Sequence, residues 1–467
     1  MDRLPSFAQR LSTSALSRRR FLSVALVGTA SAALAACGAP TGQPASAPTA
    51  AATAAPSSGA ATNASNASKP KITFLAQSGK ASEDRDNPVI DKYKQAQGGN
   101  VDVVWGGASA TEIQQKLLTM IAGGTPPDVF WTHTYINGGL AKRNVPADLN
   151  GYIKGDSSFK KDDYYAAALN DFAFGGKQYG LPRETTSTIL LYNKTLFDQA
   201  KVDPPTADWT WDDFVKAARA LTKGDGASKQ FGAAGFQQKG YAYYAFIRVW
   251  HEGGDVVSED RTKYTLADDP GVKAMQWIAD LVQKDKVHAS GADLGGIGAD
   301  EFFNTGRVAM MPSISVYSAY QKATFEWDIQ HLPKSPQGKQ ITRNASAGHS
   351  IVAQSKAADT AWSFVSYLAS KDVFEHMAKL GLLIPSHKAV AEEVIGNASG
   401  KPKNIKIGLD ALGYARPEPV VGDWIGVHGE IATAMEGILG PDQKPVKDSL
   451  SGIADRVTAL IQKEPKV

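Results

Sequence analysis

From Lys69 onward, segments with the pattern of a strand alternate with segments with the pattern of a helix. Residues 72–76 form a short apolar run and residues 101–105 carry apolar side chains at alternate positions, which predicts two strands. Residues 88–96, which lie between them, have the pattern of a helix. Alternating strands and helices are typical of an α/β fold with a parallel sheet, so we expect this class for the body of the protein.

Two predicted helices begin with residues that can form a capping box. Ser109 and Glu112 precede one apolar helical pattern, and Thr210 and Asp213 precede another. In each pair the hydroxyl and the carboxylate can bind backbone N–H groups that the first turn of a helix leaves unpaired. Farther along, the patterns predict one short strand and two amphipathic helices, over residues 306–312, 357–368 and 446–461.

A buried strand is predicted over residues 128–131, and its last residue is Trp131. Residues 123–127 contain two glycines and two prolines, which end the preceding helix and prevent its continuation. Ligands of open α/β sheets bind in the crevice at the carboxyl ends of the strands. Trp131 is therefore a candidate ligand-binding residue.

The charge balance argues against a nucleic-acid partner. The chain of 467 residues has a formal net charge of +3, but five arginines and one aspartate precede Cys37. The remaining chain has 45 basic and 46 acidic residues, whereas nucleic-acid binding favours a basic surface. Cys37 is the only cysteine, which excludes intramolecular disulfides and thiolate metal sites.

The first 37 residues have the pattern of a targeting segment. Residues 17–22 contain paired arginines followed by Phe-Leu and resemble the twin-arginine export signal, and the apolar run over residues 24–34 is too short to span a membrane. Residues 34–38, Leu-Ala-Ala-Cys-Gly, resemble a lipoprotein cleavage box. They imply a signal peptide over residues 1–37 and a lipid on Cys37 that anchors the exported protein to the outer face of the cytoplasmic membrane. The alternative is an ordinary secretory peptide in which Cys37 occurs by chance.

Residues 38–68 consist mainly of Ala, Ser, Thr, Pro, Gly and Asn. Such a composition buries too little apolar surface to offset the entropy lost on ordering. A disordered tether between the anchor and the folded body is the expected structure of this segment.

Four blocks of residues resemble one known family in their order and spacing. They are Ala-Gly-Gly-Thr-Pro-Pro-Asp-Val-Phe-Trp at 122–131, Lys-Gln-Tyr-Gly-Leu-Pro at 177–182 with Leu-Tyr-Asn-Lys at 191–194, the segment 204–214, and Phe-Asn-Thr-Gly-Arg-Val-Ala-Met at 303–310. Together they resemble the family 1 extracellular solute-binding proteins, the maltodextrin- and multiple-sugar-binding group of bacterial ABC importers.

The resemblance implies a two-lobed periplasmic-binding-protein fold of the class II type, in which a ligand cleft lies between two α/β lobes that close by hinge motion. It implies three crossings between the lobes, near residues 182–185, 312–315 and 384–386. The expected N-terminal lobe comprises residues 69–183 and 313–385, and the C-terminal lobe residues 184–312 and 386–467. The resemblance also implies a monomer that delivers a sugar or oligosaccharide to the permease subunits of an importer.

A sugar site needs aromatic rings for the CH faces of the ligand and planar polar groups for its hydroxyls. Trp131 matches a sugar-contacting tryptophan of maltodextrin-binding relatives, although it could instead fill the core below the cleft. Arg183 and Glu184 lie at the first expected crossing. They could bind sugar hydroxyls, or they could form a salt bridge with each other in the hinge.

Four further aromatic residues are candidates for stacking. By the resemblance, Tyr243 and Tyr317 correspond to stacking aromatics, while Trp250 lies in an aromatic-rich segment whose residues could also form the apolar face of a helix. Trp424 is expected in a loop before a helix, where aromatics often serve function. His349 and Lys80 are weaker candidates, because both could be solvated.

The sequence contains none of the nucleophile-elbow, Walker, dinucleotide-binding or His-Glu-x-x-His motifs. The histidines are scattered singly, so neither a metal nor a cofactor is expected. We therefore expect reversible sugar capture rather than catalysis. The alternatives are an exported lyase or glycosidase, a surface adhesin or sensor accessory, and a binding protein for a polyol phosphate, a peptide or a polyamine.

Overall fold

The computed structural model describes residues 69–97, 99–237, 241–315, 317–379, 384–397 and 400–463, which belong to one compact unit. The expected signal peptide, Cys37 and the expected tether lie outside the described residues. None of the helices in the described part of the chain combines the length and the apolar character that a membrane span requires.

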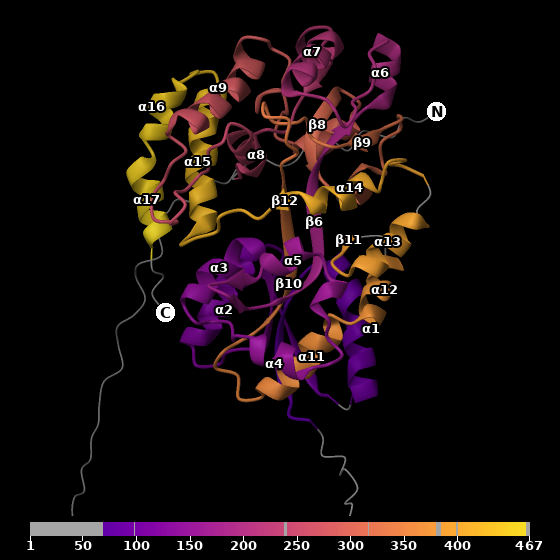
Figure 1. The fold of residues 1–467 in the computed structure, drawn as a ribbon, viewed down its shortest axis with the longest axis vertical. Helices are drawn as coiled ribbons and strands as arrows, with labels where there is room; N and C mark the ends of the chain where they lie inside the picture. The colour runs from indigo at the N-terminus through magenta and orange to yellow at the C-terminus, as the bar shows by residue number, and fades with distance from the viewer. Residues whose placement is uncertain are drawn as a thin grey trace, which may run out of the picture. The chain divides into compact units, whose positions relative to one another are not determined.

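Within the described residues, ten strands form one mixed sheet (Figure 1). Seven of them follow one another in the order β2 (Val101–Gly107), β1 (Ile72–Gln77), β3 (Val129–His133), β10 (Thr342–Ile351), β6 (Leu181–Tyr192), β8 (Val308–Ile314) and β7 (Phe231–Ala233). The other three are β9 (Asp328–Gln330) and β11 (Ile384–Pro385), which pair with β6, and β12 (Ala415–Arg416), which pairs with β10. A separate hairpin consists of β4 (Ala173–Phe174) and β5 (Lys177–Gln178).

Along the seven-strand order the pairing is parallel only toward the two ends, and the short β12 adds a parallel pairing to β10. β1 pairs in parallel with β2 and β3, and β7 pairs in parallel with β8. In the middle, β10 runs antiparallel to both β3 and β6, and β6 runs antiparallel to β8. The expectation of a parallel sheet was therefore incomplete, because β6 and β10 are long strands that carry the chain in opposite directions through the centre.

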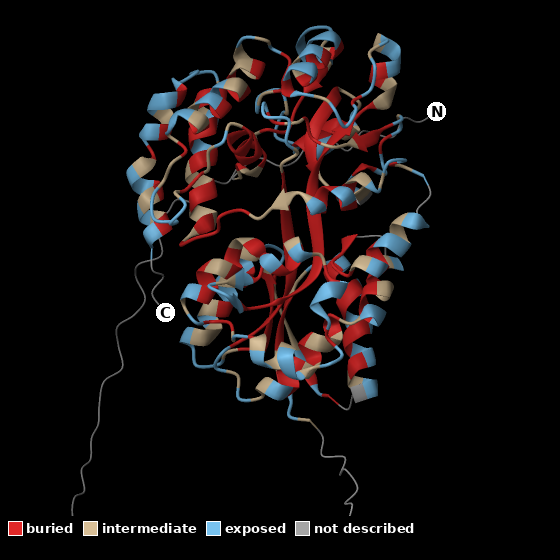
Figure 2. Ribbon diagram, in the orientation of Figure 1, coloured by how far each residue is buried: buried red, intermediate tan, exposed pale blue. Residues whose placement is uncertain are grey.

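The helices cover the sheet in two groups, with exposed residues on their outer faces (Figure 2). One group packs with β1–β3: α1 (Lys80–Gln97), α2 (Ala110–Ala122), α3 (Thr134–Lys142), α4 (Asn150–Gly155), α5 (Ala166–Asn170), α11 (Ala358–Leu368), α12 (Lys371–Lys379) and α13 (Lys388–Gly396). The other packs with β7 and β8: α6 (Lys194–Ala200), α7 (Trp211–Leu221), α8 (Tyr243–His251), α9 (Asp269–Gln283), α10 (Ala299–Asn304), α14 (Ile407–Asp410), α15 (Trp424–Leu439), α16 (Val446–Ser451) and α17 (Ala454–Gln462).

The predicted local elements agree with the structure in most places. Both capping boxes are present, at Ser109 before α2 and at Thr210 before α7. The helix expected from residue 88 begins earlier, at Lys80. The single helix expected over residues 446–461 is two helices, because the first ends at Ser451, directly before Gly452, a residue that disfavours helix continuation.

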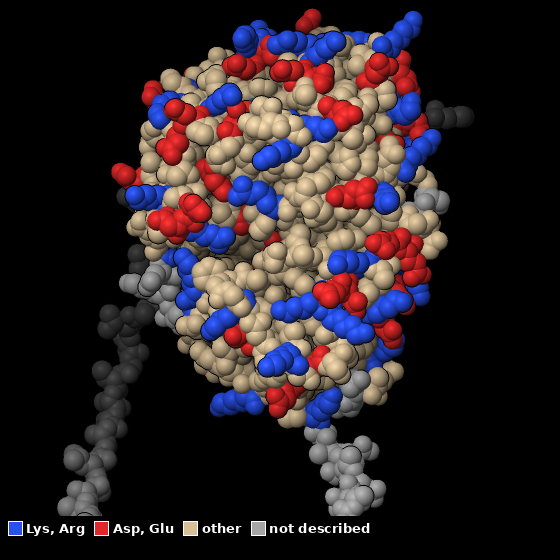
Figure 3. Space-filling model, viewed as in Figure 1, with Lys and Arg blue, Asp and Glu red and all other residues tan. Residues whose placement is uncertain are grey.

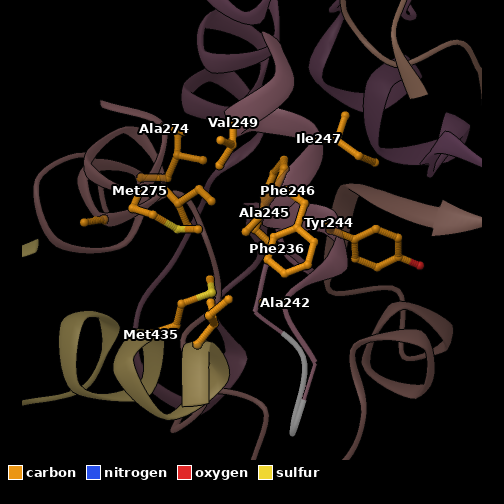
Figure 4. Packing of buried hydrophobic residues seen from close by; sticks show 14 of the residues in the cluster. Phe236, Ala242, Tyr244, Ala245, Phe246, Ile247, Val249, Ala274, Met275 and Met435 are labelled. Carbon is orange, nitrogen blue, oxygen red and sulfur yellow. The ribbon is translucent and has the colours of Figure 1, made fainter. Parts of the chain in front are cut away.

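Each group of helices encloses its own apolar core, and we call the two units the first and second lobes. In the first lobe, strands β1 and β3 contribute Phe74 and Phe130 to one cluster. In the second lobe the sheet separates two clusters, and Leu190 and Leu191 of β6 face opposite ones because successive strand side chains alternate. Figure 4 shows the cluster that contains Phe246 of α8, together with apolar side chains of α9 and α15.

Within the described part of the chain, three passages join the lobes. β6 is the first, because Leu181 packs in the first lobe and Leu190 in the second, and the crossing predicted at residues 182–185 lies within it. β10 is the second, because Ile341 before it packs against the second lobe and Ile351 at its end lies in the core of the first.

The second and third passages differ from the predicted ones. At residues 312–315 the chain stays in the second lobe, because β8 pairs with the end of β6, and Trp327 and Ile329 pack in the same lobe. Residues 313–341 therefore belong to the second lobe and not to the first. The third passage follows α13, because Val390 of that helix still lies in the first core, whereas Ala411 lies in the second lobe.

Candidate ligand site

A cavity of about 610 Å³ lies between the lobes. The first lobe contributes Gln77 and His133, the last residues of β1 and β3, and Trp131. β3 continues two residues beyond Trp131, where the sequence predicted its end. The second lobe contributes Tyr241, Tyr243 and Ile314. This is the crevice at the strand ends that the sequence predicted as the binding region.

A row of aromatic rings lines the cavity and passes from the first lobe to the second. The ring centroids of Trp131 and His133 are 5.9 Å apart, and those of His133 and Tyr135 are 4.6 Å apart. Tyr135 stacks on Tyr241 across the lobes at 5.8 Å, and Tyr241 lies 5.9 Å from Tyr243. Such a row offers apolar faces on which the CH groups of a ligand can pack.

Trp131 combines deep burial with an unused hydrogen-bond donor. Its side chain is 4% exposed, and its indole Nε1 has no hydrogen-bond partner among the described residues. A buried polar group without a hydrogen-bond partner lowers stability. A ligand oxygen that accepts from this N–H would remove that cost, which favours binding.

His133 serves both the wall of the cavity and the start of α3. Its Nδ1 accepts a hydrogen bond from the backbone N–H of Tyr135 at 3.3 Å. Burial, together with the positive charge of Arg343, lowers the pKa of His133 to about 4. The ring is therefore neutral near pH 7.

Four charged residues form a buried network at the first passage. Arg183 is bound to the carboxylate of Glu184, and its Nη1 lies 3.7 Å from Oδ1 of Asp86, whose carboxylate also binds Arg85 at 2.7 Å. Burial alone would raise the pKa of Glu184, but Arg183 outweighs that effect and lowers the pKa. The network is thus electrically balanced, yet Nη1 of Arg183 has no hydrogen-bond partner among the described residues.

A second buried ion pair joins Arg343, which lines the cavity, to Glu418, which does not. The guanidinium of Arg343 lies over the ring of Tyr243, 4.5 Å from its centroid. Burial would raise the pKa of Glu418, but Arg343 and His428 outweigh it and lower the pKa to about 2. The charge of Arg343 at the cavity wall is therefore balanced by a carboxylate outside the lining.

The structure brings together four of the predicted site residues. Trp131, Arg183, Glu184 and Tyr243 all line the cavity. Arg183 and Glu184 combine the two interpretations that the sequence left open, because they form a salt bridge and line the cavity at the same time.

Three predicted residues are engaged elsewhere. Trp250 is buried in α8 and donates its Nε1–H to Asp255 at 2.9 Å. Tyr317 is partly buried and donates to the backbone oxygen of Ile405 at 3.4 Å. His349 is buried, and burial lowers its pKa to about 3. None of the three is among the residues that line the cavity.

Trp424 and Lys80 also lie away from the cavity lining. Trp424 was expected in a loop but is the first residue of α15, because the Asp423 side chain accepts from the N–H of Gly426 and caps the helix. Trp424 is 1% exposed and packs in the second lobe. Lys80 is exposed and pairs with Asp84 in the next turn of α1, at 2.6 Å.

The sequence did not single out several lining residues, namely Arg85, His133, Tyr135, Tyr241 and Arg343. His133 had a usable signal, because it follows Trp131 by two positions and side chains two apart in a strand share a face. Arg343 had no such signal, since its partners lie far away in the chain. No group of three or more His, Cys, Asp or Glu within the described residues is placed to hold a metal ion.

Comparisons with known proteins agree with the fold. A solved ABC substrate-binding protein of Listeria monocytogenes, in complex with cycloalternan, is 27% identical with a TM-score of 0.73, covering 85% of this chain and 100% of that one. UgpB of Mycobacterium tuberculosis, in complex with glycerophosphocholine, is 18% identical with a TM-score of 0.72, covering 84% and 99%. The diacetylchitobiose-binding protein DasA of Streptomyces coelicolor is 27% identical over 331 residues, which is 68% of this chain and 73% of the relative.

The family assignment rests on a match that covers most of the folded body. The model of the bacterial extracellular solute-binding proteins matches residues 76–373, which contain β3, β6 and β10 and the residues of the first passage. The two-lobed fold, the cavity between the lobes and this match agree, and the chain belongs to the bacterial extracellular solute-binding protein family.

Proposed function

We propose that this protein captures a sugar or short oligosaccharide reversibly between its lobes and delivers it to the permease of an ABC importer. Two relatives support a carbohydrate cargo by their names, the diacetylchitobiose-binding protein and the substrate-binding protein in complex with cycloalternan. The lobes bind, close and release the cargo without covalent chemistry, and the protein acts as a monomer.

The observation that carries this proposal is the pairing of stacked rings with two unused donors. Nε1 of Trp131 and Nη1 of Arg183 are buried without hydrogen-bond partners in the described chain, and both residues line the cavity. A sugar matches this wall, because its CH faces pack on rings while its hydroxyl oxygens accept from such donors.

The amino-terminal segment completes the proposal. Residues 1–37 direct export through a twin-arginine-type signal, and Cys37 carries the lipid that holds the protein at the outer face of the cytoplasmic membrane. Residues 38–68 form the tether. The support for this part is the sequence pattern alone, namely the paired arginines, the Leu-Ala-Ala-Cys-Gly box and the low apolar content after it.

The binding of a sugar can be tested by thermal unfolding of the full chain carrying Cys37→Ser, with maltose, maltotriose, cellobiose and diacetylchitobiose. A sugar present at about 100 times its dissociation constant adds about 2.7 kcal/mol of stability. A rise in Tm with an unaltered sugar is the expected result. The same measurement is made with a dipeptide and with glycerol phosphate. A rise only with one of these two would change the cargo, and consumption of the sugar would identify an enzyme.

Replacing Trp131 by phenylalanine is expected to weaken binding of the sugar that raises the Tm, because the ring remains but the Nε1 donor is lost. Trp131→Ala removes the ring as well and is expected to cost at least about 2 kcal/mol, about thirtyfold in the dissociation constant. Isothermal titration calorimetry measures both effects.

The matched control is Trp250→Phe, which also shortens a buried tryptophan and removes its Nε1–H, but outside the cavity lining. It should leave the dissociation constant unchanged. An equal loss of affinity in Trp131→Phe and Trp250→Phe would mean that Trp131 does not contact the cargo.

Affinity is expected to depend little on salt, because the arginines that line the cavity are each paired with a carboxylate, that of Asp86, Glu184 or Glu418, and paired charges favour an uncharged cargo. The dissociation constant should change by less than about twofold between about 50 and 500 mM NaCl, since only net charges are strongly screened. The surface agrees with this expectation, because acidic and basic residues are interspersed on the face in Figure 3. A marked loss of affinity at high salt would instead indicate a charged cargo, such as a polyol phosphate.

A further inference from the structure

One side chain connects the two lobes at the edge of the cavity. Arg343 lies on β10, and its guanidinium donates to the hydroxyl of Tyr135 and to the carboxylate of Glu418. Tyr135 belongs to α3 of the first lobe, whereas Glu418 lies just before α15 of the second. The same guanidinium lies over the ring of Tyr243 in the second lobe, 4.5 Å from its centroid.

Glu418 holds this arginine in place. Its carboxylate is 0% exposed and accepts three donors, from Arg343, from Nε1 of Trp424 at 2.8 Å and from Nε2 of His428 at 2.7 Å. A buried ion pair is costly unless additional hydrogen bonds satisfy its charges, and Glu418 has them. Residues of the second lobe therefore hold Arg343 through its bond to Glu418, separately from its contact with Tyr135.

Tyr135 is the only member of this group that comes from the first lobe. Besides the bond to Arg343, its ring stacks on Tyr241 at 5.8 Å and meets His428 edge-on at 5.3 Å. All these contacts join α3 to the second lobe, so a hinge motion that opens the cleft breaks them. The hydrogen bond from Arg343 to the Tyr135 hydroxyl therefore forms only when the two lobes are in contact.

We propose that Arg343, fixed by Glu418, is the positioning residue for lobe closure: it binds the Tyr135 hydroxyl in the closed form and thereby sets the ratio of closed to open protein before any sugar binds. This inference rests on the proposed function, in which cargo is captured by closure. A ligand shifts the equilibrium between the open and closed forms only by the difference in its affinity for them. The contact with Arg343 determines the ratio of the two forms before the ligand binds.

Two variants separate this role from a general effect on folding. Tyr135→Phe removes only the hydroxyl and keeps the ring. Glu418→Gln keeps the shape and an acceptor oxygen but removes the charge that holds Arg343. The matched control is Glu252→Gln, because the side chains of Arg248 and Glu252 form an ion pair that is only 4% and 5% exposed but lies within the second lobe.

The test is single-molecule FRET on the full chain carrying Cys37→Ser, with dyes on cysteines introduced at Lys154 and Lys216. Both lysines are exposed, Lys154 in the first lobe and Lys216 in the second, and the replaced Cys37 is the only native cysteine. No sugar is added. The ratio of closed to open molecules is expected to fall about tenfold in Tyr135→Phe, the effect of losing one hydrogen bond to a charged group.

Glu418→Gln should lower the same ratio, and Glu252→Gln should leave it at the level of the parent chain. Distance distributions that are the same in Tyr135→Phe, Glu418→Gln and the parent would overturn the inference, and so would an equal shift in Glu252→Gln. Because no sugar is used, this outcome is independent of the thermal-shift panel. A failed panel with a shifted FRET distribution would reject the cargo and keep the role of Arg343.

Discussion

Replacing Asp171 by asparagine is expected to stabilise the protein at alkaline pH and to leave its stability nearly unchanged near pH 4. Asp171 follows α5 and is buried at the strands that join the lobes, where its Oδ2 accepts from Nδ2 of Asn344 at 2.7 Å. Its other oxygen has no hydrogen-bond partner among the described residues. Burial raises the pKa of Asp171 to about 7, and the positive charge of Arg343 offsets this only in part.

The sign of the effect follows from comparing the folded and unfolded chains. Below about pH 4 the carboxyl is protonated in both, so it contributes no pH-dependent difference. Between about pH 4 and 7 the unfolded chain releases the proton first, and stability falls as pH rises. Above that window the folded protein carries a buried charge that costs about 4 kcal/mol, from roughly three pKa units at 1.36 kcal/mol each. Asparagine avoids this cost.

Urea denaturation of Asp171→Asn and of the parent chain at pH 4.5, 6 and 8 measures the effect. The difference in free energy of unfolding should grow with pH in favour of the variant. Asp156→Asn provides a control of opposite sign, because hydrogen bonds from Ser158, Ser366 and Trp362 outweigh the effect of burial and lower the pKa of Asp156. A difference between Asp171→Asn and the parent that stays constant with pH would show that Asp171 does not titrate in this range.

Replacing Arg183 by methionine is expected to lower the free energy of unfolding by about 3–5 kcal/mol, the usual cost of breaking a buried ion pair on one side. The side chain of Arg183 is 2% exposed and faces the carboxylates of both Glu184 and Asp86. Without it, the two carboxylates share only the cation of Arg85. Equilibrium denaturation in urea measures this loss.

Two further variants make the result decisive. Arg183→Met combined with Glu184→Gln removes both charges of the pair and should recover part of the loss. Arg219→Met removes one side of an ion pair in which Nη2 of Arg219 lies 2.9 Å from Oδ1 of Asp285. Because Arg219 is 59% exposed, we expect the free energy of unfolding to fall by at most about 1 kcal/mol. If Arg183→Met costs no more than Arg219→Met, the buried network does not contribute to stability in the expected way.

The elements that depend on neighbouring residues were predictable from the sequence. The capping boxes at Ser109 and Thr210 involve residues only three positions apart, and both are present. The buried strand that ends near Trp131 depends on a short apolar run between a glycine-rich turn and a helix, and it led directly to the cavity. The family resemblance rests on such local blocks, which explains why it identified the fold and four of the lining residues.

Predictions that depended on packing between distant segments were less accurate. Pro312 was expected to begin a crossing, but β8 pairs with the end of β6, which keeps the following residues in the second lobe. Trp424 has the surroundings of a loop in the sequence, yet it begins α15 and is buried against Glu418. A strand joins one lobe or the other, and a tryptophan is buried or exposed, according to the apolar residues that pack against it. Those residues come from distant parts of the chain.

The amino-acid sequence alone therefore determined the α/β class, the alternation of elements and the strand that carries Trp131, because these follow from periodicity and capping within a few residues. The tertiary structure decided the group around Arg343. Its partners Glu418 and Tyr135 are 75 and 208 residues away, and no local pattern relates them. A buried charge selects its partners only after folding has removed it from water, and that is why this part of the site could be recognised only in the folded protein.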